Sequence, residues 1–111
     1  MSDDINKSID YIYKSGQQFA EAKAQVTYLT EFLKSKRAIL TKDAMAKGAK
    51  SVAAAEIEAL SHPEYITLLE GLRDATETAE GLRWGITAAQ ARIDCWRSTE
   101  ASNRRMDRVT M

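Results

Sequence analysis

The sequence predicts an all-α fold, namely an antiparallel, coiled-coil-like helical hairpin in which a short helical connection joins two long helices. Aromatic residues make up only 7% of the chain, and alanine, leucine, glutamate, lysine and arginine dominate, as in long helices. The single proline, Pro63, leaves 62 residues before it without a break. Apolar residues also recur at spacings of three and four in both halves, which is the helical period.

The first long helix is expected over about residues 3–46. Ser2 is the expected N-cap, and Asp3 and Asp4 suit the positive end of the helix dipole. An apolar stripe with one member every seven residues follows, supported by Ile9, Ala22 and Leu29: Ile5, Ile12, Phe19, Val26, Leu33 and Leu40. The sequence leaves open whether this helix bends near Gly16 or breaks near Thr41.

The connection is expected to contain a helix over about residues 52–60. Gly48 suits the C-terminal cap of the first helix, and Ser51 can begin the short one. The stretch "SHPE" is typical of a capping box, with Ser61 as the N-cap, Glu64 reaching back to it, and Pro63 in the first helical turn.

The second long helix is expected over about residues 63–107. Its apolar seam has ten positions, spaced alternately by three and four residues: Tyr65, Leu68, Leu72, Ala75, Ala79, Leu82, Ile86, Ala89, Ile93 and Trp96. A strict seven-residue repeat predicts a left-handed supercoil with a partner helix. The seam becomes polar at Glu100 and Asn103.

The charge pattern favours the antiparallel pairing. Residues 31–50 hold six basic and two acidic side chains, whereas residues 51–91 hold two basic and seven acidic ones. The hairpin is expected to place four bases near four acids: Lys34, Lys36, Arg37 and Lys42 near Glu56, Glu58, Glu64 and Glu70. It is likewise expected to place the C-terminal arginines near Asp3, Asp4 and Asp10.

A hairpin buries only one stripe of each helix, and the second long helix carries another face made of small residues. Gly81, Gly85 and Ala88 lie on this face, with Trp84 beside it. A glycine within a helix costs about 1 kcal/mol relative to alanine, so the pair indicates close approach of another helix. We therefore expect the single domain, residues 1–111, to be completed by self-association into a homo-oligomer through these four residues. The alternative is that the glycines are exposed and tolerated.

The sequence offers little for catalysis, and we expect no enzymatic activity, cofactor or bound metal. His62 is expected to complete a helix start rather than to exchange protons. The acidic series along the second long helix lacks the histidines of a carboxylate metal site: Glu70, Asp74, Glu77 and Glu80. Cys95 has no second cysteine and is expected to be a packed, inert thiol.

Basic residues are the one ambiguous functional signal. Arg97, Arg104 and Arg108 share a helix face, with Arg105 beside them, and Lys34 and Arg37 form a second cluster near the turn. Such rows can contact nucleic-acid phosphates without reading sequence, or they can be a solvated, self-paired surface. The net charge is zero, so any nucleic-acid contact must be local.

The stretch "SHPEY…LLEGL…LRW…AQARIDCWRSTEASNRRMDR" resembles small helical proteins encoded in the early, recombination and replication regions of phages and prophages. The likeness covers residues 50–108, and its most distinctive part is a C-terminal run: Arg92, Ile93, Trp96, Arg97, Ser98, Ala101, Ser102 and Arg104. The resemblance implies a genetic setting and no particular mechanism.

Three functional hypotheses follow from these patterns. The first is an oligomeric accessory protein of a phage or prophage that assists DNA recombination or replication by binding single-stranded DNA or a DNA-processing protein. The second is an inhibitor that docks on a host nuclease or defence complex through Trp84 and the acidic face, and the third is a structural or assembly coiled coil. The N-terminus is acidic and no apolar run approaches a membrane span, so we expect a soluble protein of the bacterial cytoplasm with no membrane partner and no small-molecule substrate.

Overall fold

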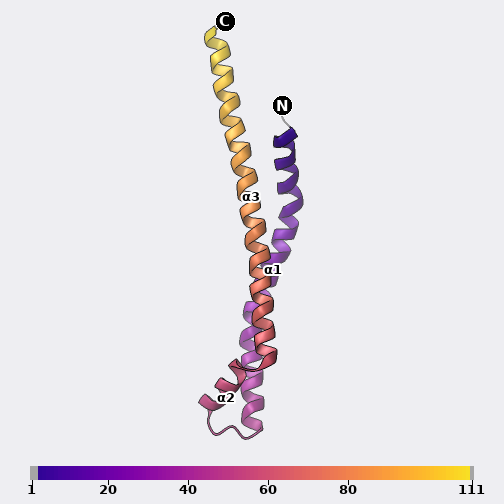
Figure 1. The fold of residues 1–111 in the computed structure, drawn as a ribbon, viewed down its shortest axis with the longest axis vertical. Coiled ribbons are helices and arrows are strands. Elements are labelled where there is room, and N and C mark those ends of the chain that lie inside the picture. The colour runs from indigo at the N-terminus through magenta and orange to yellow at the C-terminus, as the bar shows by residue number, and fades with distance from the viewer. Residues whose placement is uncertain (1–2, 111) are drawn as a thin grey trace. The chain divides into compact units, whose positions relative to one another are not determined.

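The computed structural model describes residues 3–110, which form three helices: α1 (Asp3–Ala46), α2 (Val52–Leu60) and α3 (Pro63–Thr110) (Figure 1). No strand occurs in this range, and the two long helices pack against each other. The predicted all-α hairpin with a short helical connection is therefore confirmed. α1 continues without a break past Thr41, and α3 runs three residues beyond the predicted end at 107. The predicted N-cap Ser2 lies outside the described residues.

The tertiary contacts divide the chain into two compact units. Unit 1 comprises Met1–Ala20 and Glu80–Met111, and unit 2 comprises Glu21–Ala79. Each long helix contributes a segment to both units, whereas α2 belongs wholly to unit 2. None of the described helices is long and apolar enough to cross a membrane.

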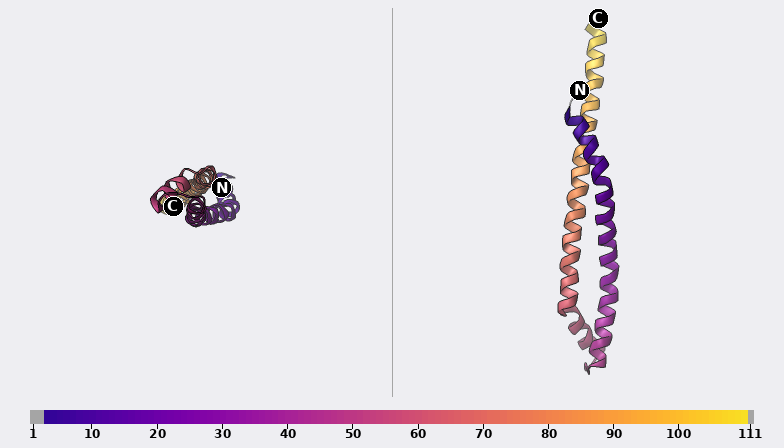
Figure 2. Two further views of the ribbon diagram at one scale, coloured as in Figure 1. Left: turned by 90° about the horizontal axis from the view of Figure 1, so that it is seen from below. Right: turned by 90° about the vertical axis from the view of Figure 1, so that its right-hand side faces the viewer.

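In unit 2, α2 packs beside the end of α1 and the start of α3 (Figures 1 and 2). Ala55 and Ala59 of α2 are 0% and 1% exposed, so their small side chains let this helix lie close to its neighbours. Leu40 and Ala44, near the end of α1, are also buried. The small alanine side chains of α2 thus allow this helix to pack closely against α1 and α3.

The turn after α1 requires glycine at position 48. Gly48 has a φ of 100°, and its N–H donates to the carbonyl of Met45 at 3.1 Å. The N–H of Ala49 donates to the carbonyl of Ala44 at 3.0 Å, which completes a Schellman motif. Ser51 then caps α2 by accepting a hydrogen bond from the N–H of Ala54 at 3.1 Å, as predicted.

The start of α3 differs from the predicted capping box. Ser61 ends α2, and its hydroxyl donates to the carbonyl of Ile57 at 2.8 Å. The cap of α3 is His62, whose Nδ1 accepts from the N–H of Glu64 at 3.1 Å. The prediction of Ser61 as N-cap was wrong because Pro63 is the first helical residue, which makes the residue directly before it the N-cap. The expected structural role of His62 is confirmed.

In unit 1, the apolar stripe of α1 contains two serines. Ser8 and Ser15 are only 3% and 5% exposed, whereas Ile9, the predicted supporting residue, is 51% exposed. The stripe that contains Ile5, Ala22 and Leu29 alternates by three and four residues. Three residues after Ile5 is position 8, so Ser8 and not Ile9 belongs to the stripe. The Ser8 hydroxyl has no hydrogen-bond partner among the described residues, which weakens this part of the seam.

The predicted seam of α3 is confirmed along its whole length. All ten of its positions are buried or half-buried, and the most buried are Ala79, Ala89 and Ile93, at 7%, 4% and 8% exposure. Glu100 is half-buried and Asn103 is exposed, so the seam ends where its residues become polar.

Two glycine substitutions of identical chemistry are expected to change stability in opposite directions. Gly48→Ala places a Cβ on a residue with positive φ and should destabilise the fold by about 1–2 kcal/mol. Gly16→Ala lies within α1 with open space around it and should stabilise by about 0.5–1 kcal/mol. Urea unfolding of the two variants checks this, and changes of the same sign would contradict it.

Candidate nucleic-acid interface and partner surfaces

The C-terminal part of α3 extends past the start of α1. In unit 1, Tyr11 lies against Gly85. Because both helices rise by about 1.5 Å per residue and run in opposite directions, Asp3, eight residues before Tyr11, is level with Ile93, eight residues after Gly85. The later turns of α3 therefore have no part of the described α1 beside them (Figures 1 and 2).

The arginines on this extension are exposed. No ion pair links Arg104, Arg105 or Arg108 to another residue within 3–110. Arg97 has only a long contact, 3.8 Å from its Nη1 to Asp94 Oδ1, and both side chains are at least 61% exposed. Such an exposed pair contributes about 0–1 kcal/mol, so it holds the arginine weakly.

The predicted pairing of these arginines with the N-terminal aspartates is not present among the described residues. Asp10 instead pairs with Lys14 of the same helix, at 3.5 Å. The pairing was wrong because Asp3 is level with Ile93, so the acids at the start of α1 lie several turns short of Arg104 and Arg108.

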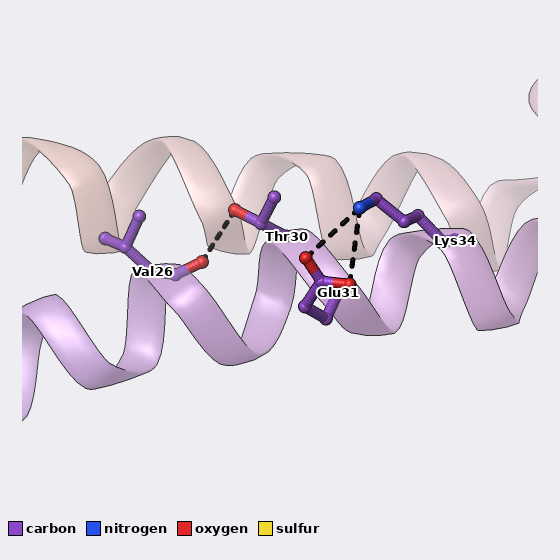
Figure 3. Close-up of polar contacts among 4 residues, drawn as sticks. All are labelled: Val26, Thr30, Glu31 and Lys34. Carbon is purple, nitrogen blue, oxygen red and sulfur yellow. Dashed lines mark hydrogen bonds and ion pairs between the residues drawn. The ribbon is translucent and has the colours of Figure 1, made fainter.

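Both members of the second predicted basic cluster have a carboxylate partner within unit 2. Lys34 Nζ lies 3.1 Å from a carboxylate oxygen of Glu31, one helical turn earlier (Figure 3). Arg37 Nη2 lies 3.5 Å from Glu56 Oε2 of α2, an ion pair that the charge pattern predicted. A phosphate would have to compete with these carboxylates, although such exposed pairs contribute only about 0–1 kcal/mol each.

Lys36 makes a second predicted ion pair across the hairpin. It occupies a seam position of α1, yet its Nζ reaches Glu64 Oε2 at 3.0 Å, and its side chain is only 21% exposed. The hydrogen bond from Lys36 and its positive charge hold the pKa of the Glu64 carboxyl below its ordinary value. His62 adds a smaller lowering of the same pKa.

The small-residue face of α3 is partly used within the chain. A Cβ on Gly85 would overlap the Tyr11 hydroxyl, so this glycine admits a side chain of α1. Nothing lies within 4 Å of a Cβ built on Gly81, and Ala88 is exposed. A groove of about 350 Å³ runs along this face between the helices, lined by Lys7, Ser8, Tyr11, Gly85, Ala88, Ala89 and Arg92.

Trp84 lies beside this face and is 61% exposed. The guanidinium of Arg83 lies 4.7 Å from the centre of the Trp84 ring, a cation–π contact. Arg83 is itself held by Glu80, with its Nε and Nη2 at 2.9 and 2.7 Å from Oε2. The indole is thus presented on the surface with a fixed charged neighbour.

Cys95 and the acidic side chains are the remaining candidates from the sequence. Cys95 is free and exposed rather than packed, because its position lies outside the seam that contains Ile93 and Trp96. Within residues 3–110, no group of three or more histidine, cysteine or acidic side chains could hold a metal ion.

Sequence reasoning missed a second apolar stripe on α1, which we call the second seam. Its seven positions lie in unit 2 and alternate by three and four residues: Gln25, Tyr28, Phe32, Ser35, Ile39, Lys42 and Ala46. Tyr28 and Ile39 are 59% and 51% exposed. The spacing itself was a usable signal, but it is hidden beside the longer stripe that pairs with α3.

Comparison with known proteins gives no relative from which a role could be transferred, since no family model, curated protein or solved structure matches the chain. The surfaces described above therefore have to be interpreted from their own chemistry.

The ion pair across the hairpin predicts a pH effect. Lys36→Met should raise the pKa of Glu64 toward its ordinary value, which a carbon-13 NMR titration of the carboxyl measures. In the parent protein, the stabilisation by this pair is present above the pKa of the unfolded-state glutamate and is lost as pH falls through the lower folded-state pKa. Lys34→Met removes the same charge two residues away and should leave the pKa of Glu64 unchanged. An equal effect of both variants would contradict the assignment.

Proposed function

We propose that this chain is a non-enzymatic, self-associating helical accessory protein of a phage or prophage, which assists DNA recombination or replication in the bacterial cytoplasm. It acts by binding single-stranded DNA, or a protein that handles such DNA, through the arginines at the end of α3. The genetic setting comes from the resemblance of residues 50–108, and the binding surface comes from the geometry of α3.

The observation that carries the proposal is the contrast between the two basic clusters. Arg104, Arg105 and Arg108 lie beyond the start of α1 with no ion pair in the described part of the chain, whereas Lys34 and Arg37 each lie within 3.5 Å of a carboxylate oxygen. An arginine without a carboxylate partner can offer its guanidinium to a phosphate with two parallel hydrogen bonds. Binding then requires no internal ion pair to break.

A cluster of this kind predicts weak binding by one copy. Each phosphate contact on single-stranded DNA contributes about 0.7 to the slope of log K against log salt, so three arginines give a modest, salt-sensitive affinity. Self-association multiplies such contacts on one strand and raises the affinity through effective concentration. The zero net charge of the chain confines the interaction to this local surface.

Removing two of the free arginines should weaken binding more than removing two of the paired cations. Arg104→Ala with Arg108→Ala should reduce affinity for a labelled single-stranded oligonucleotide and lower the salt slope by about 1.4, in fluorescence anisotropy. Lys34→Ala with Arg37→Ala is the matched control, because it removes the same charge from side chains bound to Glu31 and Glu56. Equal losses in both double variants, or no binding by the parent protein at low salt, would reject the DNA interface.

Trp84 favours a second candidate function, an inhibitor that docks on a host nuclease or defence complex. An exposed tryptophan with an ordered arginine beside it is the type of residue that dominates the energy of protein interfaces. Exposure of 61% leaves most of the indole available to such a partner.

This second candidate makes a different prediction. Trp84→Ala should abolish inhibition of the target nuclease and leave oligonucleotide binding unchanged, because the indole is a surface group and the arginines are distant in sequence. Inhibition assays with host nucleases, run beside anisotropy on the same variant, separate the two functions. Loss of DNA binding with Trp84→Ala would count against the inhibitor and place the indole in the DNA interface.

A further inference from the structure

The second seam is an apolar face of α1 that the hairpin does not use. Tyr28 and Phe32 pack edge to face, with ring centres 5.7 Å apart and planes at 76°. With Glu31, Ser35 and Ile39 they line an open cleft of about 350 Å³ on the surface of unit 2. Two of these large apolar side chains, Tyr28 and Ile39, are more than half exposed.

The other helices leave Tyr28 and Ile39 of this face more than half exposed, whereas Phe32 is half-buried. Arg37, which binds Glu56 of α2, is nine residues from Tyr28 and therefore points to the opposite side of α1, at about 100° per residue. On the side toward α3, Phe32 shares a cleft with four residues of that helix: Pro63, Glu64, Thr67 and Leu68. The second seam therefore runs along α1 beside the hairpin contact rather than beneath it.

The pattern of the second seam is that of a helix-pairing surface. From Gln25 to Ala46 it follows the three-four alternation without interruption over about 33 Å, or three heptads. Its apolar members, Tyr28, Phe32, Ile39 and Ala46, share one face of α1 with three polar positions, and an apolar group with this spacing is typical of a helix-pairing surface.

We propose that the second seam is the interface of a homodimer, in which α1 of a second copy packs against it in the antiparallel direction about a two-fold axis. This inference rests on the self-association in the proposed function and names its surface and symmetry. In this register Phe32 faces Ser35 of the second copy, and Tyr28 faces Ile39 of the second copy. Gln25 faces Lys42 of the second copy.

Size and charge both favour the antiparallel over the parallel orientation of two copies. The antiparallel register places the large Phe32 opposite the small Ser35 at the centre, twice, so that one chain supplies both halves of a complementary surface. A parallel pair would place Phe32 against Phe32, Ser35 against Ser35, and Lys42 against Lys42. The first of these layers would be overfilled, the second would leave a void, and the third would bring like charges together. The antiparallel layers avoid all three.

The test uses two charged variants of facing residues, measured by sedimentation equilibrium. Tyr28→Lys and Ile39→Glu should each weaken self-association of the full chain by at least about tenfold, because a charge is then set against an apolar side chain. An equimolar mixture of the two should associate again with nearly the parent affinity. In the mixed dimer the introduced lysine faces the introduced glutamate in one pair, and the other pair remains Tyr28 against Ile39.

Ile66→Glu is the matched control, since Ile66 is 43% exposed on α3 in the same unit but lies outside the second seam. It should leave self-association unchanged, and circular dichroism should show the same helix content in all variants. Single variants that associate like the parent protein would overturn the interface. A mixture that fails to associate, after both single variants have lost association, would overturn the antiparallel register.

The failure of this inference is distinguishable from failure of the proposed function. A parent protein that sediments as a monomer overturns both the interface and the proposed self-association, while the arginine variants still test DNA binding separately. Loss of oligonucleotide binding in Tyr28→Lys, with association unchanged, would identify Tyr28 and Phe32 as a base-stacking surface and overturn the dimer interface. If the parent protein does not self-associate but binds another protein, and Tyr28→Lys abolishes that binding, the homodimer interface is overturned as well.

Discussion

The seam between α1 and α3 is the contact on which the rest of the structure depends. A two-helix hairpin has one apolar interface. The residues that pack in this interface therefore determine which other faces of the helices remain exposed. Its quality varies along the chain: in the series of positions seven residues apart that has the buried Leu29 in unit 2, unit 1 has Ser8 and Ser15. Serine contributes little apolar area, and the Ser8 hydroxyl, which has no hydrogen-bond partner among residues 3–110, adds a cost, so this series of positions stabilises the seam less near the N-terminus.

A single seam also leaves much of each helix unused, and the surfaces of functional interest lie there. The second seam of α1 and the exposed Trp84 of α3 are apolar groups that the hairpin leaves in solvent. The arginines at the end of α3 are left over for a different reason, because α3 continues past the level of Asp3. These unused surfaces are a consequence of helix length and of the narrow width of a helix-pairing stripe.

The pairing of charges differs between the turn of the hairpin and the end of α3, although the chain is neutral as a whole. Near the turn, Lys36 and Arg37 bind Glu64 and Glu56 across the hairpin, so acids and bases there help to align the helices. At the end of α3, no carboxylate of the described α1 is level with the arginines. The same residue type thus has a structural role at one end and is available to an external anion at the other.

The sequence by itself determined the fold class and nearly all helix bounds, because periodicity and capping residues such as Gly48 and Ser51 act locally. It was ambiguous where two registers competed, as between Ser8 and Ile9, or where adjacent residues could serve as cap, as between Ser61 and His62. Only the tertiary structure decided which charges are paired and that Tyr11 takes the space beside Gly85. Those outcomes depend on the level at which two distant helices meet, which no local spacing specifies.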